Sequence, residues 1–319
     1  MHDLSCLIFA AALLISLAID HYLGEPPVRW HPVVWMGNYL KWAAPHVLPA
    51  LPLSPDTRDF KSFVFGALAW AAGVAIVLVA ACSLQWAVLT LPAVAAALLL
   101  GLLLKPMLAW AMLRREVQAV EVALGESLDA GRLRLAMLVS RDTTNLSESE
   151  VRESAIESLA ENLNDSVIAP IFWFVLFGLP GAALYRFANT ADAMWGYRGL
   201  RNGVNWEWAG KWAAWADDVL SWLPARITGL LLALLAGGVS FKTLQTEARK
   251  TPSPNSGWPM AAMALALKVC LQKPGVYALN PAGRQPQPLD TGLAQKYASN
   301  TLIAQVFIAS IAIVLIATI

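Results

Sequence analysis

Long apolar runs alternate with long polar stretches along this chain of 319 residues. Runs of about 16 to 20 apolar residues, the length that a helix needs to cross a bilayer core, occupy residues 4–19, 63–82, 86–104, 167–184, 219–239 and 301–319. Strands of a transmembrane barrel would instead give alternating segments of about ten residues, and the sequence has no such segments. The pattern predicts an all-α fold: a polytopic membrane helix bundle of about five or six spans, with amphipathic helices and long polar loops, forming a single integral membrane domain over residues 1–319.

The polar stretches that connect these runs differ in charge. They cover residues 20–62, 105–166, 185–218 and 240–300, and a three-residue turn at 83–85 is predicted between the second and third runs. The four long connections carry 4, 7, 4 and 7 Lys and Arg residues. If six spans alternate strictly, the first, second and fourth connections share one face, and positive residues favour the cytoplasmic one.

Strict alternation would place residues 185–218 on the face opposite the other polar motifs. We therefore expect one segment to be re-entrant or bent around a polar cavity. One candidate is the helix that carries Arg226, and the other is the run 167–184, which is interrupted by Pro170, Gly178 and Pro180.

Composition agrees with a membrane protein, because 57% of the residues are hydrophobic and only 14% are charged. A formal net charge of +1 argues against nucleic-acid binding, which usually needs a strongly basic surface. Cys6, Cys82 and Cys270 are scattered in apolar surroundings, so neither a disulfide framework nor a cysteine metal site is predicted. No Lys or Arg precedes Arg29, so we interpret the first run as a retained helix rather than a secretory signal.

Residues 150–165 have helical periodicity with acids on one side. At about 100° per residue, an arc of about 120° holds Glu150, Glu153, Glu157, Glu161 and Asp165. One interpretation is the solvated face of an amphipathic helix. However, acids at i,i+4 repel one another and no Lys or Arg shares their face. This favours a bound divalent cation, because Mg²⁺ usually binds through one or two carboxylates plus substrate phosphates. Just before this helix, residues 140–145, with Arg141, form either an oxyanion site or a polar turn and N-cap.

A second polar motif follows the run 167–184. It begins with Asn189, Asp192, Trp195 and Arg198 and continues through residues 201–211. Six of the 14 tryptophans lie between residues 195 and 222, which predicts either an aromatic belt at the headgroup level or a platform for a large flat ligand. Lys211 either pairs with Glu207 at i,i+4 or contacts phosphate. The planar guanidinium binds oxyanions in a bidentate manner. We therefore expect Arg198, Arg201 and Arg226 to be better candidates for phosphate binding than Lys211.

Two proline-rich segments complete the candidate chemistry. Residues 251–259 cannot be helical, and a helix is predicted to begin at or near Pro259 and to cover residues 260–271. The N-terminus of such a helix, beside Asn255 and Ser256, either binds a phosphate or is a structural cap. Near the N-terminus, His21 and His31 are either metal ligands or bases, or structural residues beside prolines.

Taken in order, these motifs resemble one family. Residues 20–37, 140–143, 157–166, 189–198, 202–211 and 251–260 are similar to the CobD/CbiB-type adenosylcobinamide-phosphate synthases of cobalamin biosynthesis. The likeness covers most of the chain. It implies a multi-pass enzyme of the cell inner membrane with cytoplasmic active-site loops. The implied reaction uses ATP to join adenosylcobyric acid to (R)-1-aminopropan-2-ol, or its O-phosphate, through an amide bond. Because the sequence has no soluble nucleotide-binding fingerprint, ATP would occupy an unusual site.

The resemblance also suggests roles for particular residues. We expect Mg²⁺ on Glu157, Glu161 and Asp165 to assist transfer of the ATP γ-phosphoryl group to a propionate carboxylate, and the amine then displaces phosphate from the acyl phosphate. The predicted catalytic residues are Glu157, Glu161, Asp192 and Lys211, with Asp192 as a metal ligand or as a base for the ammonium. Substrate or phosphate contacts are predicted for Arg141, Asn189, Trp195, Arg198, Arg201, Asn205, Trp206, Asn255 and Ser256. The expected partners are the corrinoid, aminopropanol phosphate, the lipid bilayer and other membrane enzymes of cobalamin assembly.

Two alternatives belong to other functional classes. The chain also resembles, more distantly, the AmpE-type membrane sensors linked to β-lactamase induction, although the His-Pro motif at residue 31 and residues 251–258 favour the synthase. An ion-coupled transporter would likewise explain acids at membrane depth and a broken apolar segment. Binding of adenosylcobyric acid separates the synthase from both alternatives.

Overall fold

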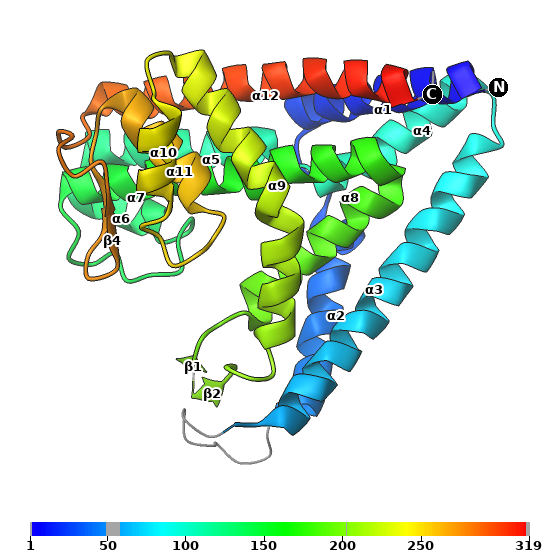
Figure 1. Cartoon of the computed structure of the whole chain (residues 1–319), viewed down its shortest axis with the longest axis horizontal. Helices are drawn as coiled ribbons and strands as arrows, with labels where there is room; N and C mark the ends of the chain where they lie inside the picture. Colours follow the sequence, from blue (N-terminus) through cyan, green and yellow to red (C-terminus); the bar gives the residue numbers. More distant parts are fainter. Residues whose placement is uncertain (1, 49–57, 202, 317–319) are drawn as a thin grey trace. The chain divides into compact units, whose positions relative to one another are not determined.

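The computed structural model describes residues 2–48, 58–201 and 203–316, and it is built almost entirely from helices (Figure 1). Within the described residues, six helical segments are long and apolar enough to cross a membrane: Cys6–Leu23, Phe60–Leu89, Ala93–Glu126, Glu148–Trp195, Lys211–Ala236 and Pro288–Leu315. Each overlaps a predicted apolar run, so the all-α class and the expectation of five or six helices able to span a membrane are confirmed. The last three residues of the final run, 317–319, lie outside the described residues.

The helices form two compact units, each assembled from separated stretches of the chain. The first unit takes residues up to Leu108, Pro170–Leu220 and the residues from Ala309 onward. The second takes Ala109–Ala169 and Ser221–Ile308. Because each unit consists of more than one stretch of the chain, no single position in the sequence divides one unit from the other.

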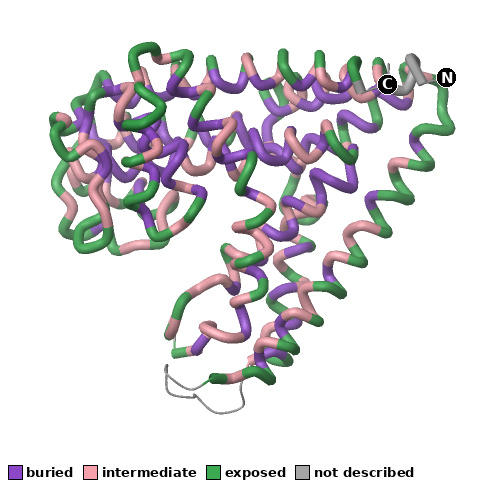
Figure 2. Tube along the Cα trace, viewed as in Figure 1, coloured by how far each residue is buried: buried purple, intermediate pink, exposed green. Residues whose placement is uncertain are grey.

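The first unit is built mainly from long helices. It contains α1 (His2–Leu23), the 3-10 turn η1 (Val28–Trp30), α2 (Pro32–Val47), α3 (Phe60–Leu89), α4 (Ala93–Leu104), the 3-10 turn η2 (Lys105–Met107), most of α8 (Ala169–Trp195), the strands β1 (Leu200–Arg201) and β2 (Val204–Asn205), and the beginning of α9 (Lys211–Ala236). α1 packs closely against α4 at Gly101, where any side chain would meet Ile15 and the backbone of Ala12. By contrast, α3 is exposed or half-buried along most of its length (Figure 2).

The turn predicted at residues 83–85 is wrong. α3 continues through Gln85 to Leu89, and the chain turns only before Pro92, which is the N-cap of α4. A proline stops the preceding helix more effectively than the polar pair Ser83 and Gln85, because it lacks an N–H and restricts the residue before it. Gln85 also has a tertiary role that its sequence context did not reveal: its Oε1 accepts a hydrogen bond of 2.7 Å from the backbone N–H of Leu179.

That hydrogen bond lies at the kink of α8. Gly178 has a φ of 67° and a ψ of −152°, so the helix is interrupted there, and Pro180 follows two residues later. The freed N–H of Leu179 is satisfied by Gln85, as an irregular backbone at membrane depth requires. The predicted bend within residues 167–184 is therefore confirmed at Gly178, although the cavity that Leu179 and Ala183 line is apolar rather than the polar one expected.

The second unit surrounds helix α7. It contains α5 (Trp110–Glu126), α6 (Leu128–Leu135), α7 (Glu148–Leu163), the π-helical turn η3 (Asn164–Ile168), the end of α9, α10 (Phe241–Ala248), α11 (Gly257–Leu267), the antiparallel strands β3 (Leu271–Lys273) and β4 (Tyr277–Leu279), and most of α12 (Pro288–Ile316). α11 begins two residues before the predicted Pro259. It ends at Leu267, before the predicted limit of residue 271, because Lys268 adopts the left-handed conformation and β3 follows.

Candidate functional site

The acidic helix predicted over residues 150–165 is α7, which the capping box of Ser147 and Glu150 starts at residue 148. Its acidic side is not a solvated face, so that interpretation is wrong. Glu153 is 1% exposed and Glu157 is 5% exposed. The β3–β4 hairpin contributes to this cover, since the backbone N–H of Gln272 donates to Glu153 and the hydroxyl of Tyr277 donates to Glu157.

Glu157 is held through both of its carboxylate oxygens. The Tyr277 hydroxyl donates to Oε1 at 2.9 Å, and the Arg141 guanidinium donates to Oε2 at 3.1 Å. The same Arg141 nitrogen also donates to the hydroxyl of Ser154. Charge-assisted bonds of this kind fix the orientation of a carboxylate, so Glu157 presents its charge in one defined direction.

These side chains line a polar cavity of about 200 Å³ in the second unit. The lining comprises Leu138, Val139, Ser140, Arg141, Ser154, Glu157, Ser158, Glu161, Asn162, Lys273 and Tyr277. Of the residues predicted from the sequence, Arg141, Glu157 and Glu161 therefore meet at one place. Asp165 is not in the lining; it lies in η3, where it accepts a hydrogen bond from Asn164.

The cavity fits a two-carboxylate magnesium site better than the predicted three-carboxylate one. Within the part of the chain that the structure describes, no three or more His, Cys, Asp or Glu side chains gather closely enough to hold a metal ion. Thus Glu157, Glu161 and Asp165 do not form one such group. Glu157 and Glu161 do line the same cavity, and two carboxylates completed by substrate phosphates are a usual arrangement for Mg²⁺.

Two cavity residues, Lys273 and Tyr277, were missed in the sequence. They lie on facing positions of the β3–β4 hairpin. Its turn runs from Lys273 to Val276, whose N–H donates to the Lys273 carbonyl at 2.9 Å, with Gly275 at a φ of 73°. Proline followed by glycine at the centre of a turn is a strong local signal, so Pro274 and Gly275 could have revealed the hairpin but not what it contacts.

The tryptophan motif lies in the first unit, where Trp195 and Trp206 stack with ring centroids 6.0 Å apart. Asn189 donates to Asp217, and the Asn205 side chain accepts from the backbone N–H of Glu207. Asp192 lies in α8 next to Gly196, whose N–H donates to the Asp192 carbonyl. Trp195 is only 1% exposed, so the stacked pair packs inside the first unit rather than presenting an open aromatic face.

Two cations of this motif, Lys211 and Arg201, already have protein partners. Lys211 lies 3.7 Å from Glu207 and 4.2 Å from the Trp208 ring centroid, which agrees with the ion-pair interpretation. The Arg201 guanidinium stacks 3.4 Å above the Tyr197 ring. Arg198 follows directly after Tyr197, and Asn202 lies outside the described residues.

The proline-rich segment 251–259 is organised around Arg226 in the second unit. Arg226 donates to the Asn255 side chain at 2.7 Å and to the Pro254 carbonyl at 3.1 Å. Its guanidinium also lies over the rings of Trp222 and Trp258. Ser256 donates its backbone N–H to Ser253 Oγ. These contacts favour a structural role for Arg226 and Asn255.

A buried charge cluster occupies the N-terminal motif of the first unit. Lys105, only 2% exposed, lies 3.2 Å from Asp20 and 2.6 Å from Glu25. His31 contacts Glu25 through Nε2 at 3.2 Å and caps α2 through Nδ1. Burial raises the pKa of Glu25, but hydrogen bonds from His31 and Lys105 outweigh this effect and lower it. The cluster favours the structural interpretation of His31, whereas the ring of His21 packs edge-on against Tyr22.

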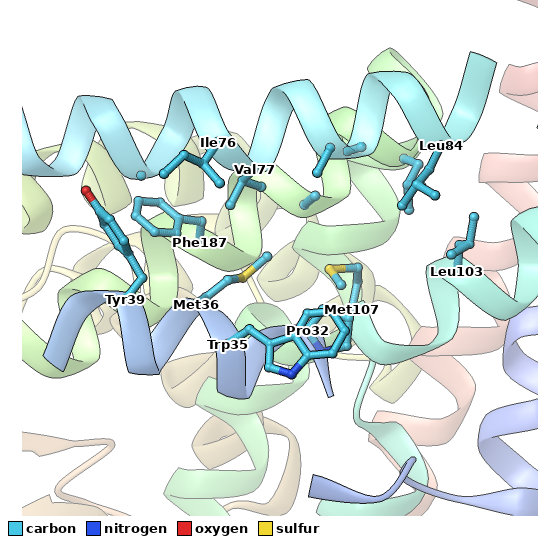
Figure 3. A pocket seen from close by; sticks show the side chains of 15 residues that line it. Pro32, Trp35, Met36, Tyr39, Ile76, Val77, Leu84, Leu103, Met107 and Phe187 are labelled. Carbon is cyan, nitrogen blue, oxygen red and sulfur yellow. The ribbon is translucent and has the colours of Figure 1, made fainter. Parts of the chain in front are cut away.

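The first unit also encloses an apolar cavity of about 240 Å³ (Figure 3). Residues of α2, including Trp35 and Met36, lie opposite Ile76 and Val77 of α3. Tyr39 contributes a hydroxyl, but this group donates to the Ala69 carbonyl at 2.7 Å. No charged side chain lines the cavity, so it provides no group for acid–base or phosphoryl chemistry.

The long apolar helices and the acid-lined cavity define a multi-pass membrane protein with a polar site. The family model described as CobD/Cbib protein matches residues 13–302. The chain therefore belongs to the CobD/CbiB family, whose relatives are named as proteins of cobalamin biosynthesis.

Curated relatives support this assignment across bacteria and archaea. The probable cobalamin biosynthesis protein CobD of Methanothermobacter thermautotrophicus is 42% identical over 295 residues, covering 84% of this chain and 86% of the relative. The cobalamin biosynthesis protein CobD of Chromobacterium violaceum is 40% identical, covering 82% and 81%. That of Brucella suis is 34% identical, covering 93% and 95%. No solved structure matches the chain.

Proposed function

We propose that this protein is the amide-forming ligase of cobalamin biosynthesis that joins adenosylcobyric acid to (R)-1-aminopropan-2-ol or its O-phosphate, with ATP as the energy source. Membership of the CobD/CbiB family supports the pathway. The observation that carries the chemistry is the polar cavity, where Glu157 and Glu161 lie with Arg141. Carboxylates with an adjacent guanidinium are suited to binding a metal-complexed phosphate.

The reaction needs activation because a carboxylate is a poor electrophile. In the proposed first step, a carboxylate oxygen of the corrinoid attacks the γ-phosphorus of ATP, the bond to the β-phosphate oxygen breaks, and ADP leaves. In the second step, the amine nitrogen attacks the acyl carbon and inorganic phosphate leaves. The ammonium proton passes to a base. The sequence predicts Asp192, which lies in the first unit, for this role. Positioning and charge neutralisation supply most of the acceleration in such transfers.

The chain's own groups have separate tasks in this scheme. Arg141 would neutralise negative charge that develops on phosphate oxygens, and its bond to Glu157 orients that carboxylate. Glu157 and Glu161 would hold Mg²⁺, which supplies charge neutralisation to the phosphates when it is bound. The substrate contacts proposed for Asn189, Arg198, Arg201, Asn205, Ser256 and the Trp195–Trp206 pair can each be tested by a single substitution. The bond of Asn255 to Arg226 and the ion pair of Lys211 with Glu207 favour structural roles for those two residues.

The six apolar helices support a multi-pass membrane protein. We further propose that it lies in the cell inner membrane with its polar loops on the cytoplasmic side, where ATP is available. Partners of this proposed enzyme would be the corrinoid, aminopropanol phosphate and neighbouring membrane enzymes of cobalamin assembly.

The direct test uses purified, detergent-solubilised protein with adenosylcobyric acid, aminopropanol phosphate, ATP and Mg²⁺, followed by mass spectrometry. We expect an amide product that requires both ATP and the metal. Parallel reactions with free aminopropanol identify the preferred amine. If folded protein forms no product and does not bind the corrinoid, the ligase proposal is wrong and the sensor or transporter alternative takes its place.

A further inference from the structure

The β3–β4 hairpin reaches the acidic side of α7 from a distant part of the sequence. Tyr277 and Glu157 are 120 residues apart, yet their side chains are hydrogen-bonded at 2.9 Å. Lys273 pairs with Tyr277 across the hairpin and lines the same cavity. The three-residue connection 274–276, with Pro274 and Gly275, sets this register, so both side chains are placed at the cavity by one local structure.

Arg141 retains donor capacity toward the cavity. Its NH2 group donates to Glu157 and Ser154, and its other nitrogens make no hydrogen bond within the described part of the chain. Guanidinium has five N–H donors in a fork that matches phosphate oxygens. The bond to Glu157 fixes the guanidinium in place, so little conformational entropy would be lost when its remaining donors bind an anion.

Lys273 is the second cation of the cavity. Its side chain is exposed and forms no ion pair or hydrogen bond with any residue that the structure describes. An ammonium group brings three further donors. With two carboxylates also in the lining, the cavity has a balanced charge, and a bound divalent cation would leave it positive. Such a site attracts a polyanion.

Tyr277 stabilises the arrangement between these charges. Its hydroxyl, on strand β4, donates to Glu157 across 2.9 Å and lines the cavity with it. It therefore holds Glu157 Oε1 while Arg141 holds Oε2. Through this bond, Tyr277 orients the Glu157 carboxylate at the cavity.

We propose that Arg141 and Lys273 form a phosphate-binding subsite in this cavity, with Tyr277 as a positioning residue that holds Glu157 beside it. The proposal deepens the ligase function and rests on it for the identity of the ligand, which is a phosphate group of the nucleotide or of aminopropanol phosphate. The subsite itself depends only on the cavity and its donors. Phosphate binding can therefore be measured without turnover.

The test measures binding to the purified protein in detergent by calorimetry. The probes are a non-hydrolysable ATP analogue with Mg²⁺, aminopropanol phosphate and inorganic pyrophosphate with Mg²⁺. Lys273→Gln is expected to weaken binding about tenfold or more, because it removes a charge-assisted contact, and to reduce the salt dependence. The matched control is Lys268→Gln, which removes an exposed lysine outside the cavity lining.

The probes separate the possible ligands. A loss confined to the nucleotide analogue and pyrophosphate assigns the subsite to ATP, and a loss confined to aminopropanol phosphate assigns it to the amine substrate. Either result supports the proposal. If Lys273→Gln and Lys268→Gln bind all three probes with the same affinity, the subsite is wrong even when amide product forms. Weakened pyrophosphate binding without amide product would retain the subsite and remove the ligase function.

Tyr277→Phe tests the positioning role separately. The ring and its packing are kept, so the protein should fold, but Glu157 loses one of its two donors. Residues that orient metal ligands typically contribute 10–100-fold to metal affinity or activity, and we expect a loss in that range for Mn²⁺ binding, measured by electron paramagnetic resonance. Unchanged Mn²⁺ affinity with a lowered unfolding temperature would show that the hydroxyl is merely structural.

Discussion

The charge cluster around Lys105 and the one around Arg141 differ in what surrounds them. In the first unit, Lys105 is enclosed between Asp20 and Glu25, and none of these residues lines the apolar or the polar cavity described above. In the second unit, Arg141 is bonded to Glu157, but both side chains line a polar cavity. Hydrogen-bond donors that are paired with buried side chains stabilise the fold, whereas donors that face a cavity can also bind a ligand. An ion pair alone therefore does not mark a functional site.

The largest expected effect is on the enclosed cluster. Lys105→Met leaves two carboxylates buried without their cation. Removing one partner of a buried ion pair typically costs about 3–5 kcal/mol, so little folded protein should survive detergent extraction. Size-exclusion chromatography and tryptophan-detected thermal unfolding measure the loss.

A compensated variant checks the cause of this effect. Lys105→Met combined with Asp20→Asn and Glu25→Gln removes the unpaired charges, and we expect it to recover much of the lost stability. If Lys105→Met unfolds at the wild-type temperature, the cluster is not structural and the contrast between the two units fails.

The next effect concerns the open cavity and should leave folding intact. Glu161→Gln keeps the shape of the side chain but removes its charge, and we expect kcat to fall about 10²–10³-fold, as for loss of a preorganised electrostatic group. The thermal unfolding temperature should stay near the wild-type value. Product formation followed by mass spectrometry measures the rate.

The control for Glu161→Gln is Glu126→Gln on α5, which neutralises an exposed acid outside this cavity. It should have wild-type activity and stability. Near-normal turnover in Glu161→Gln would contradict the metal role proposed for this carboxylate.

The sequence predicted those parts of the structure that local patterns determine. The apolar runs became long helices, the acids before residue 165 became α7, and the glycine and prolines of residues 167–184 predicted its bend. The α3–α4 boundary was misplaced because polar residues are weaker helix breakers than Pro92. The polar side chain of Gln85 was mistaken for a sign of a turn. It is accommodated inside the apolar helix because it accepts a hydrogen bond from the distant Leu179 N–H.

The candidate site was only partly predictable for the same reason. Periodicity placed Glu157 and Glu161 on one side of a helix, but it could not show that this side is covered by a hairpin 120 residues away. Nor could it reveal that Lys105, at the end of an apolar run, reaches partners 80 or more residues earlier in the chain. Burial and charge pairing across such distances depend on tertiary packing, which the spacing of residues in one segment does not encode.

A smaller effect is expected from the pH dependence of the enclosed cluster. Because the pKa of Glu25 is lowered in the folded protein, its contribution is complete at neutral pH and disappears as pH falls through that lowered value. Glu25→Gln should cost about 1.5–3 kcal/mol at pH 7, the range for a hydrogen bond to a charged group. Below pH of about 4.3, the ordinary glutamate value, the difference between the two proteins should shrink. Thermal unfolding at several pH values tests this, and a constant difference down to acid pH would contradict it.

The smallest effect is expected for an ion pair that is neither enclosed nor beside the cavity. Asp129 lies 3.0 Å from Arg132 at i,i+3, and its side chain is 85% exposed. Exposed pairs contribute about 0–1 kcal/mol because water and salt screen them, so Asp129→Asn should unfold within a few degrees of the wild type and retain full activity. Arg132 would keep its bond to the Leu146 carbonyl. If Asp129→Asn lost more stability than Glu25→Gln, the exposure of an ion pair would not predict its contribution to the stability of this protein. The Lys105 and Arg141 clusters would then differ only in that Arg141 lines a cavity.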